Sequence, residues 1–206
     1  MQSFHTRDIN KIEVFDSQSD LIIYDVDKNE VTNIENDSTE FECYPTWSPD
    51  GKWLYYVSAH FEFRDTIPHE AECIKRSKEI KYSIYRKSFN PETMQFGPRE
   101  MVFDAASLGK SATLPRISPE GKYLLFSMGE WGCFHIWHRD ADLYMLRLAD
   151  NKVWPLTKTN SPQAESFHNF SSNGKWIIFS SRRNDGDYTR LFFAHVDADG
   201  NTTKAF

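Results

Sequence analysis

The segment 129–142 carries the densest group of side chains that could do chemistry. Its charged, aromatic and sulfur-bearing members include Glu130, Trp131, Cys133, His135, Trp137, His138 and Arg139. Cys133, His135 and His138 could bind zinc or copper, because thiolate and neutral imidazole suit these metals, although their spacing fits no standard zinc signature. Trp131 and Trp137 could instead stack on a sugar or a peptide. We expect the third alternative, ordinary packing with hydrogen-bonded histidines, and therefore no bound metal and no cofactor.

A second group lies in the segment 181–190, where Arg182 and Arg183 stand close to Asp185 and Asp187. A guanidinium group can grip a ligand carboxylate through two parallel hydrogen bonds. The same arginines can instead form ion pairs within the protein. We expect the structural role and keep ligand binding as the alternative.

The sequence shows none of the usual catalytic motifs. The segment 104–111 superficially resembles a phosphate-binding loop, but Asp104 replaces its first glycine and it does not open a predicted helix. No Gly-x-Ser-x-Gly nucleophile elbow, His-Glu-x-x-His pair or paired Cys-x-x-Cys motif occurs. No two acids stand out as a glycosidase pair. We therefore expect no catalytic residue within this chain.

An internal repeat predicts the elements that position these side chains. Three segments align without gaps, at 45–58, 115–128 and 168–181. In each, a serine is followed by a Pro-Asp-Gly, Pro-Glu-Gly or Ser-Asn-Gly turn, a lysine and an aromatic residue. Glycine suits such a turn because it adopts positive φ without strain. The apolar run after each turn predicts a strand that is covered on both faces.

A weaker unit recurs between these hairpins, at 21–26, 84–89, 143–148 and 191–196. Each copy is an apolar strand followed by a turn-like stretch and a further short strand. The two units together span about 47 residues at their shortest, close to the ~40–50 residues of a four-stranded propeller blade. The sequence therefore predicts an all-β fold, a partial β-propeller of about three and a half four-stranded blades.

The segment Pro-Thr-Trp-Ser-Pro-Asp-Gly-Lys at 45–52 resembles the WD40-like PD40 repeat of TolB-like β-propellers. The segment 115–126 is similar to the same repeat, and 170–179 is similar except for Ser172 and Asn173 in place of proline and aspartate. The resemblance implies the propeller fold and a periplasmic or otherwise exported setting. It says less about function, because such propellers serve many roles.

These repeats divide the chain into an N-terminal segment and a series of blades. We expect a segment of uncertain structure at 1–20, a half-blade at 21–41, and blades at 42–112, 113–164 and 165–206. Pro68 and the charged run after it predict a short helix near 68–79, inserted in the first full blade. A partial ring leaves open strand edges, so we expect further blades of a larger protein, or a second copy, to close them. Alternatively, residues 1–20 supply a degenerate closing strand.

The composition excludes several classes of protein. The 206 residues include 24 Lys and Arg against 30 Asp and Glu, a net charge of −6, which argues against a nucleic-acid partner. No apolar run is long enough for a membrane span, and the first residues lack the apolar stretch of a signal peptide. Three cysteines allow at most one disulfide.

The longest connections should lie on one face of the arc, because each follows the second strand of a blade. Loops of this kind concentrate function. We expect a non-catalytic scaffold that presents them to a protein or peptide partner, or to a glycan or other cell-envelope ligand. The alternative is the propeller domain of a larger hydrolase, either a prolyl-oligopeptidase-type peptidase or a glycan-active enzyme, whose catalytic residues lie outside this chain.

Overall fold

The computed structural model describes residues 2–8, 11–64 and 66–206, with side chains from Val14 onward. The described chain is built mainly from antiparallel strands. The strands are β1 (Gln2–Asp8), β2 (Lys11–Asp16), β3 (Leu21–Asp25), β4 (Glu30–Glu35), β5 (Glu40–Trp47), β6 (Trp53–His60), β7 (Ser83–Asn90), β8 (Gln95–Phe103), β9 (Ser111–Ile117), β10 (Tyr123–Gly129), β11 (Asp142–Arg147), β12 (Lys152–Pro155), β13 (Glu165–Phe170), β14 (Trp176–Ser181) and β15 (Arg190–His195). The helical turns are α1 (His69–Lys75), η1 (Ser77–Glu79), η2 (Ala106–Leu108) and η3 (His135–Trp137).

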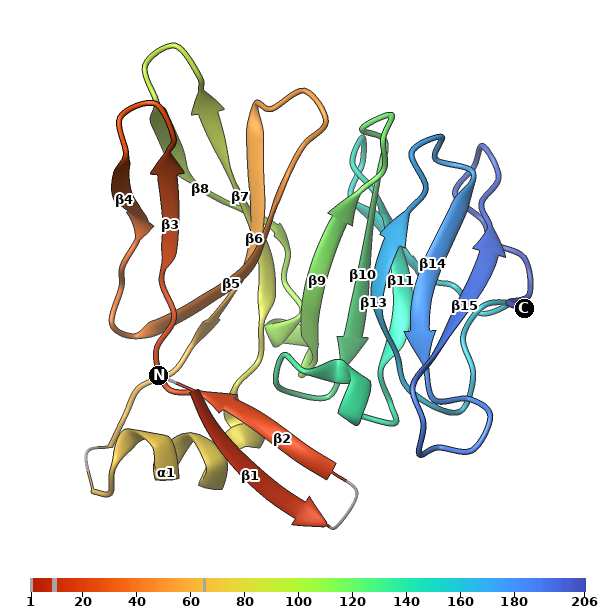
Figure 1. Ribbon diagram of the computed structural model, residues 1–206, viewed down its shortest axis with the longest axis horizontal. Helices are drawn as coiled ribbons and strands as arrows, with labels where there is room; N and C mark the ends of the chain where they lie inside the picture. Colours follow the sequence, from red (N-terminus) through yellow and green to blue (C-terminus); the bar gives the residue numbers. More distant parts are fainter. Residues whose placement is uncertain (1, 9–10, 65) are drawn as a thin grey trace.

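The strands form a partial β-propeller, drawn as an arc of blades in Figure 1. β3 and β4 make a two-stranded half-blade. The sheet β5-β6-β7-β8 is the first full blade, and β9-β10-β11-β12 is the second. β13, β14 and β15 form the last blade. The first strands of neighbouring blades contact each other, β5 with β9 and β9 with β13, so they form the inner wall of the arc. The predicted all-β propeller is confirmed.

The last blade differs from the four-stranded prediction. Its fourth position is taken by the segment 202–206, which pairs with β15 only at intervals. Phe193 and Phe206 exchange two backbone hydrogen bonds of 3.0 and 3.1 Å, and Thr203 N donates to His195 O over 3.0 Å. His195 N donates to the Thr203 hydroxyl, so a side chain takes the place of a ladder carbonyl. The fourth strand is therefore replaced by an irregular extended segment.

The turn predicted by the repeat has the same geometry in all three blades. The serine hydroxyl accepts a hydrogen bond from the backbone N–H of the aromatic residue five positions later, over 3.0 Å at Ser48, 3.0 Å at Ser118 and 3.1 Å at Ser171. The turn glycine donates its N–H to the carbonyl of the same serine. Gly121, for example, has φ of +73°. Each blade therefore carries the turn as a self-contained local unit.

Each inner strand also contains a bulge that the repeat did not predict. Tyr44, Leu114 and Phe167 occupy equivalent positions, each four residues before the turn serine. Their φ angles are +53°, +55° and +47°. The ladder to the next strand shifts register at the same place in every blade. Because a bulge bends a strand and increases its twist, the inner strands of the three blades bend alike.

The core lies in the junctions between blades. Between the first and second blades, Val57 and Ile84 pack in one cluster with Leu124 and Phe126. The second junction buries a similar set, namely Leu125, Leu143, Met145, Ile177 and Phe179. A smaller cluster joins the half-blade to the first blade, namely Leu21, Leu54 and Tyr56.

The two ends of the strands make different faces (Figure 1). The tight turns lie along the upper edge of Figure 1, which we call the tight-turn face. α1, η3 and the connection 182–189 lie along the lower edge, the loop face. The helix expected near 68–79 corresponds to α1 and η1. In the described residues, no helix is both long and apolar enough to cross a membrane.

The N-terminal hairpin lies on the loop face. β1 and β2 pair with each other as a separate two-stranded sheet, and both contact α1. They therefore do not supply the closing strand that was one alternative for residues 1–20. Their ladder partners lie within the hairpin, so β1 and β2 do not extend any blade.

Alanine substitutions at two turn glycines should separate backbone strain from steric crowding. A Cβ at Gly121 would meet no atom within 4 Å, so only its positive φ is penalised, by about 1 kcal/mol. At Gly200, where φ is +77°, the Cβ would also lie 2.9 Å from Tyr123 Cε1. We expect Gly200→Ala to lower the free energy of unfolding more than Gly121→Ala, as measured by urea denaturation. Equal losses would contradict the crowding at Gly200.

Candidate functional site

The loop 129–142 buries its central histidine among hydroxyl groups. The His135 Nδ1 atom is 3.1 Å from Thr113 Oγ1 and 3.1 Å from Ser127 Oγ. Ser127 Oγ in turn donates to Glu165 O over 3.0 Å. Burial lowers the pKa of His135 to about 3, so its ring is neutral. The Ser127 hydroxyl therefore joins the second blade to the first strand of the last blade, and His135 contacts that hydroxyl.

Trp131 and His138 pack against each other at the N-terminal hairpin. Their ring centroids are 4.2 Å apart. The Trp131 ring is also stacked with Phe15 of β2, with 6.5 Å between centroids. Glu130, the neighbouring residue, is exposed. This geometry fits the packing interpretation, and a ligand-stacking role for Trp131 stays a prediction.

Cys133 does not form a metal site with the two histidines. Its Sγ atom lies 3.9 Å from Asp16 Oδ2, whereas His135 Nδ1 faces hydroxyl groups. Within the described ranges, no group of three or more His, Cys, Asp or Glu side chains could hold a metal ion. The described structure therefore does not bring Cys133, His135 and His138 together as a group that could hold a metal ion. The three cysteines of the chain are free thiols.

The end of the same loop is held by the last blade. Arg182 is buried, and its Cζ atom lies 4.7 Å from the centroid of the Trp137 ring. Arg182 Nη2 also donates to Asp187 O. Arg139 Nε donates to Pro162 O over 3.0 Å. A guanidinium group over an aromatic ring is most favourable where water is excluded, so Trp137 and Arg182 fasten two connections of the loop face together.

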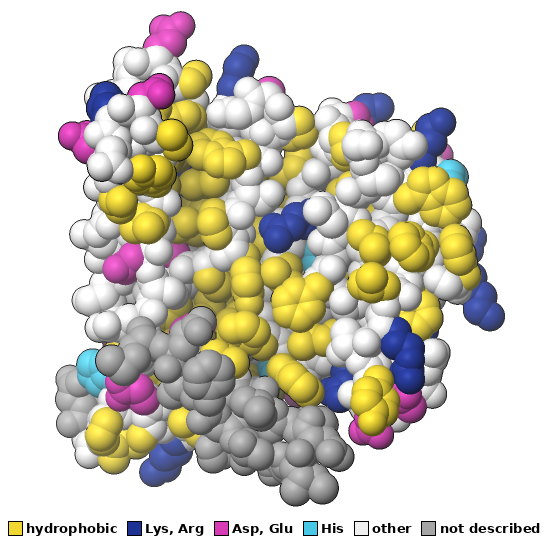
Figure 2. Space-filling view, in the orientation of Figure 1, with side chains coloured by type: hydrophobic (Ala, Val, Ile, Leu, Met, Phe, Trp, Pro, Cys, Tyr) yellow, Lys and Arg dark blue, Asp and Glu magenta, His cyan; other side chains and the backbone are white. Residues whose placement is uncertain are grey.

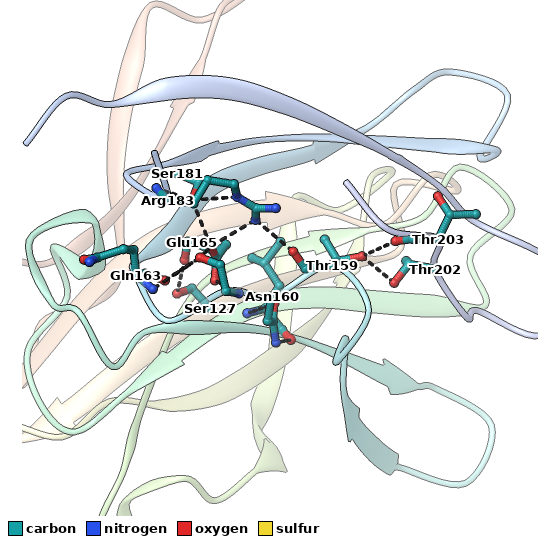
Figure 3. A network of polar contacts seen from close by, with 11 residues as sticks. Ser127, Thr159, Asn160, Gln163, Glu165, Ser181, Arg183, Thr202 and Thr203 are labelled. Atoms are coloured by element: carbon teal, nitrogen blue, oxygen red, sulfur yellow. Dashed lines mark hydrogen bonds and ion pairs between the residues drawn. The ribbon is translucent and has the colours of Figure 1, made fainter. Parts of the chain in front are cut away.

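Arg183 belongs to a buried ion pair (Figure 3). Glu165 of β13 is 0% exposed. Its Oε1 atom accepts hydrogen bonds from Arg183 Nη2 at 3.0 Å, Ser161 Oγ at 2.6 Å and Ser181 Oγ at 2.8 Å. The Arg183 guanidinium also lies 4.6 Å from the centroid of the Phe192 ring. This geometry fits the structural role expected for Arg183, because a carboxylate of the protein already occupies it.

The same network reaches the irregular C-terminal segment. Arg183 Nη2 donates to Thr159 O over 2.8 Å. Thr159 Oγ1 lies 2.6 Å from Thr202 Oγ1 and 2.9 Å from Thr203 O. Figure 3 shows these groups as one connected set of polar contacts. The network therefore fixes the segment that replaces the fourth strand of the last blade.

One buried carboxylate, that of Glu42, could not be singled out from the sequence. Glu42 of β5 is buried, and neither of its carboxylate oxygens has a hydrogen-bond partner in the described structure. Its backbone N–H donates to Ser19 O over 3.1 Å, in the connection that leads to the half-blade. Burial, together with the nearby charges of Glu35 and Glu40, raises the pKa of Glu42 to about 7. Its position in a strand was predictable, but its burial depends on the half-blade packed beside it.

The tight-turn face carries two open grooves, each between consecutive blades. The first, between the first and second blades, has a volume of about 370 Å³, and its lining includes Trp53, Tyr55, Arg86, Ile117, Glu120 and Leu148. The second, between the second and last blades, has a volume of about 470 Å³, and its lining includes Glu120, Lys122, Lys175, His195 and Asp197. On the loop face, the apolar hollow beside Trp131 has a volume of about 20 Å³, enough for roughly one water. The larger grooves therefore lie on the tight-turn face, whereas the loop face is the one predicted from the sequence to carry function.

Comparison with known proteins identifies the fold. No family profile and no curated protein matches the sequence. TolB from Acinetobacter baumannii is similar in structure, with a TM-score of 0.54 and 20% identity over 95% of this chain and 37% of that one. Puromycin hydrolase has a TM-score of 0.56 and 13% identity, over 98% of this chain and 30% of that one. Oligogalacturonate lyase from Vibrio parahaemolyticus has a TM-score of 0.52 and 16% identity, over 89% of this chain and 43% of that one.

These findings define the class of protein. At such identities a structural likeness shows the fold alone. The chain is a partial β-propeller with a TolB-like fold, which confirms the resemblance seen in the sequence. It spans less than half the length of each of these three structures.

Removing Arg183 should be costly, because it leaves the Glu165 carboxylate buried without its cation. We expect Arg183→Met to lower the free energy of unfolding by about 3–5 kcal/mol. Arg190 pairs with Asp185 over 2.7 Å at the surface, so the control Arg190→Met should cost less than about 1 kcal/mol. Chemical denaturation measures both variants. Similar losses would show that the buried pair does not stabilise the last blade.

Glu42 should make stability depend on pH. Its pKa is about 7 in the folded chain against an ordinary value of 4.5, so between these values the folded state binds a proton that the unfolded state has released. The free energy of unfolding due to Glu42 therefore falls as the pH rises through this window, by about 3 kcal/mol.

Glu42→Gln removes this loss. Urea denaturation should therefore show a larger stability advantage of Glu42→Gln over the wild type above pH 7 than below pH 4.5. Glu92→Gln is the control, because Glu92 is exposed in the turn between β7 and β8, away from Glu42. A pH-independent advantage of Glu42→Gln would contradict the raised pKa.

Proposed function

We propose that this chain is a non-catalytic binding propeller that holds an extended protein or peptide segment on its tight-turn face. The observation that carries the proposal is the pair of grooves that meet at Glu120. Together they run across three blades, a shape that suits an extended segment. The turns beside them are fixed by the same hydrogen bonds at Ser48, Ser118 and Ser171. A site that is already ordered loses less entropy when it binds.

The first groove offers an apolar wall beside charged groups. Trp53 and Leu148 are only half-buried, so part of each side chain is open to a ligand. The Arg86 guanidinium lies 4.0 Å from the centroid of the Trp53 ring and pairs with Glu100 over 2.9 Å. These contacts hold the tryptophan in place. Glu120 is exposed at the rim, so the groove suits an apolar side chain followed by a basic one.

The second groove continues from the same carboxylate. A Cβ added to Gly174 would lie 2.8 Å from Glu120 Oε2, so the carboxylate rests against the turn of the last blade. Beyond it, the groove is lined by Lys122 and Lys175 as well as Asp197. A segment that places a basic side chain at Glu120 and an acidic one near these lysines would match both grooves. This mixed charge favours a protein segment over a uniformly charged polymer.

A second candidate function is the propeller domain of a larger hydrolase. It is supported by the similarity to puromycin hydrolase, of which this chain covers 30%. In that role the catalytic residues would lie outside this chain, and the grooves would receive part of the substrate. An exported setting, and with it a glycan or other cell-envelope ligand, belongs to the proposal through the TolB-like resemblance alone.

Glu120 should control peptide binding. We expect short extended peptides that alternate lysine with valine to bind the chain in isothermal titration calorimetry. Glu120→Gln should weaken this binding by roughly 10- to 100-fold, because it removes a charge-assisted hydrogen bond. Glu62→Gln, 77% exposed in the connection that leads to α1, is the matched control and should bind like the wild type. Equal effects of the two variants, or binding of oligosaccharides in place of peptides, would overturn the proposal.

A further inference from the structure

Both ends of the arc expose an apolar sheet face. Of the fourteen large apolar side chains that are exposed in the described residues, nine lie at these ends. The incoming face, on the half-blade, consists of Ile22, Tyr24, Val26 and Val31. The outgoing face, on the last blade, consists of Phe167, Trp176, Leu191, Phe193 and Phe206. Figure 2 shows apolar side chains gathered over the last blade.

The buried junction between the second and last blades shows what such faces do. On the second blade, Leu125, Leu143 and Met145 are fully buried against Ile177 and Phe179 of the last blade. Leu125 and Met145 are directly opposite each other on β10 and β11, so they project from one side of the sheet. That side, which packs on the next blade along the chain, is the outgoing face of the second blade.

The outgoing face of the last blade repeats this arrangement in register. Leu191 is paired with Ser180 of β14, as Leu143 is paired with Ser127 of β10. Phe193 is paired with Ile178, as Met145 is paired with Leu125. Leu143 is fully buried, whereas Leu191 is 62% exposed. The same positions therefore form the same kind of docking face, and in the described residues no blade covers it.

The half-blade exposes the complementary face. Ile22 and Tyr24 of β3 occupy the positions of Tyr144 and Leu146 in β11. Those two residues pack with the first blade, and Leu146 is fully buried there. Each interior junction joins an outgoing face to an incoming face. Along the described chain, the arc leaves one face of each kind uncovered.

We infer that two copies of this chain associate head to tail, with the outgoing face of each packed on the β3–β4 half-blade of the other. Such a heterologous contact either closes into a ring or continues as a filament. Each copy supplies three blades and one half-blade, so a closed pair holds six blades and two half-blades in eight positions, within the roughly four to eight blades of closed propellers. Once one junction has formed, the second is intramolecular and is favoured by the high effective concentration.

Light scattering of the full chain tests the association. At micromolar concentration we expect twice the 24.1 kDa mass of one chain. Leu191→Asp places a charge in the outgoing face and should weaken association by roughly 100-fold. Leu108→Asp is the matched control, because Leu108 is also 62% exposed but lies on η2, away from both faces. Thermal denaturation verifies that both variants fold.

Mixing two variants tests the head-to-tail geometry. Ile22→Asp disrupts the incoming face, so Ile22→Asp and Leu191→Asp should each be monomeric alone. When mixed, they retain one intact pair of faces and should form a heterodimer. If two copies instead met through the same face, one of the two variants would remain dimeric by itself, and the head-to-tail contact would be overturned.

Three further results would overturn the proposal. They are a monomer throughout the micromolar range, equal losses in Leu191→Asp and Leu108→Asp, and oligomers that grow without limit as the concentration rises. The test is independent of peptide binding, because Glu120 lies on neither end face. The two proposals can therefore fail separately.

Discussion

Packing between the faces of neighbouring blades is the interaction on which this structure depends. The strand that follows each tight turn is apolar on both sides, so that Leu124 packs toward the first blade while Leu125 packs toward the last. Both are fully buried. Burial of apolar area is the main driving force of folding, and here most of that area lies between sheets. Each blade is therefore stable only with its neighbours, as in other repeat architectures.

The same constraint explains why the reactive side chains of the loop face serve structure. Two packed sheets bury the ends of their connections, and any polar group there needs a partner. His135 contacts hydroxyl groups, Arg182 covers Trp137, and Arg183 neutralises Glu165. The His135 contacts lie within the second blade, the Arg182 contact crosses from the last blade to the second, and the Arg183 contact links strands of the last blade. A neutral histidine and a paired arginine are compatible with such a junction, whereas an unpaired charge would not be.

The sequence could predict the parts of the fold that are local. The turn at Ser48 depends on residues within six positions, so its repetition revealed the blades. The bulge at Tyr44 could not be predicted, because tyrosine rarely adopts positive φ and nothing in its type indicates that it does so here. The pairing of Trp137 with Arg182 and the burial of Glu42 depend on residues distant in the chain. Residue types in 129–142 therefore suggested metal chemistry that the three-dimensional arrangement does not assemble.

The difference between the two faces also follows from blade packing. On the loop face, long connections fold across the junctions and fill them, as the contact between Trp137 and Arg182 shows. On the tight-turn face, each turn is too short to reach the next blade, so every junction between full blades ends in an open groove. A ligand in such a groove touches two blades at once and stabilises their junction. We therefore expect the proposed binding at Glu120 to be coupled to the packing between blades, because the same junctions shape the grooves.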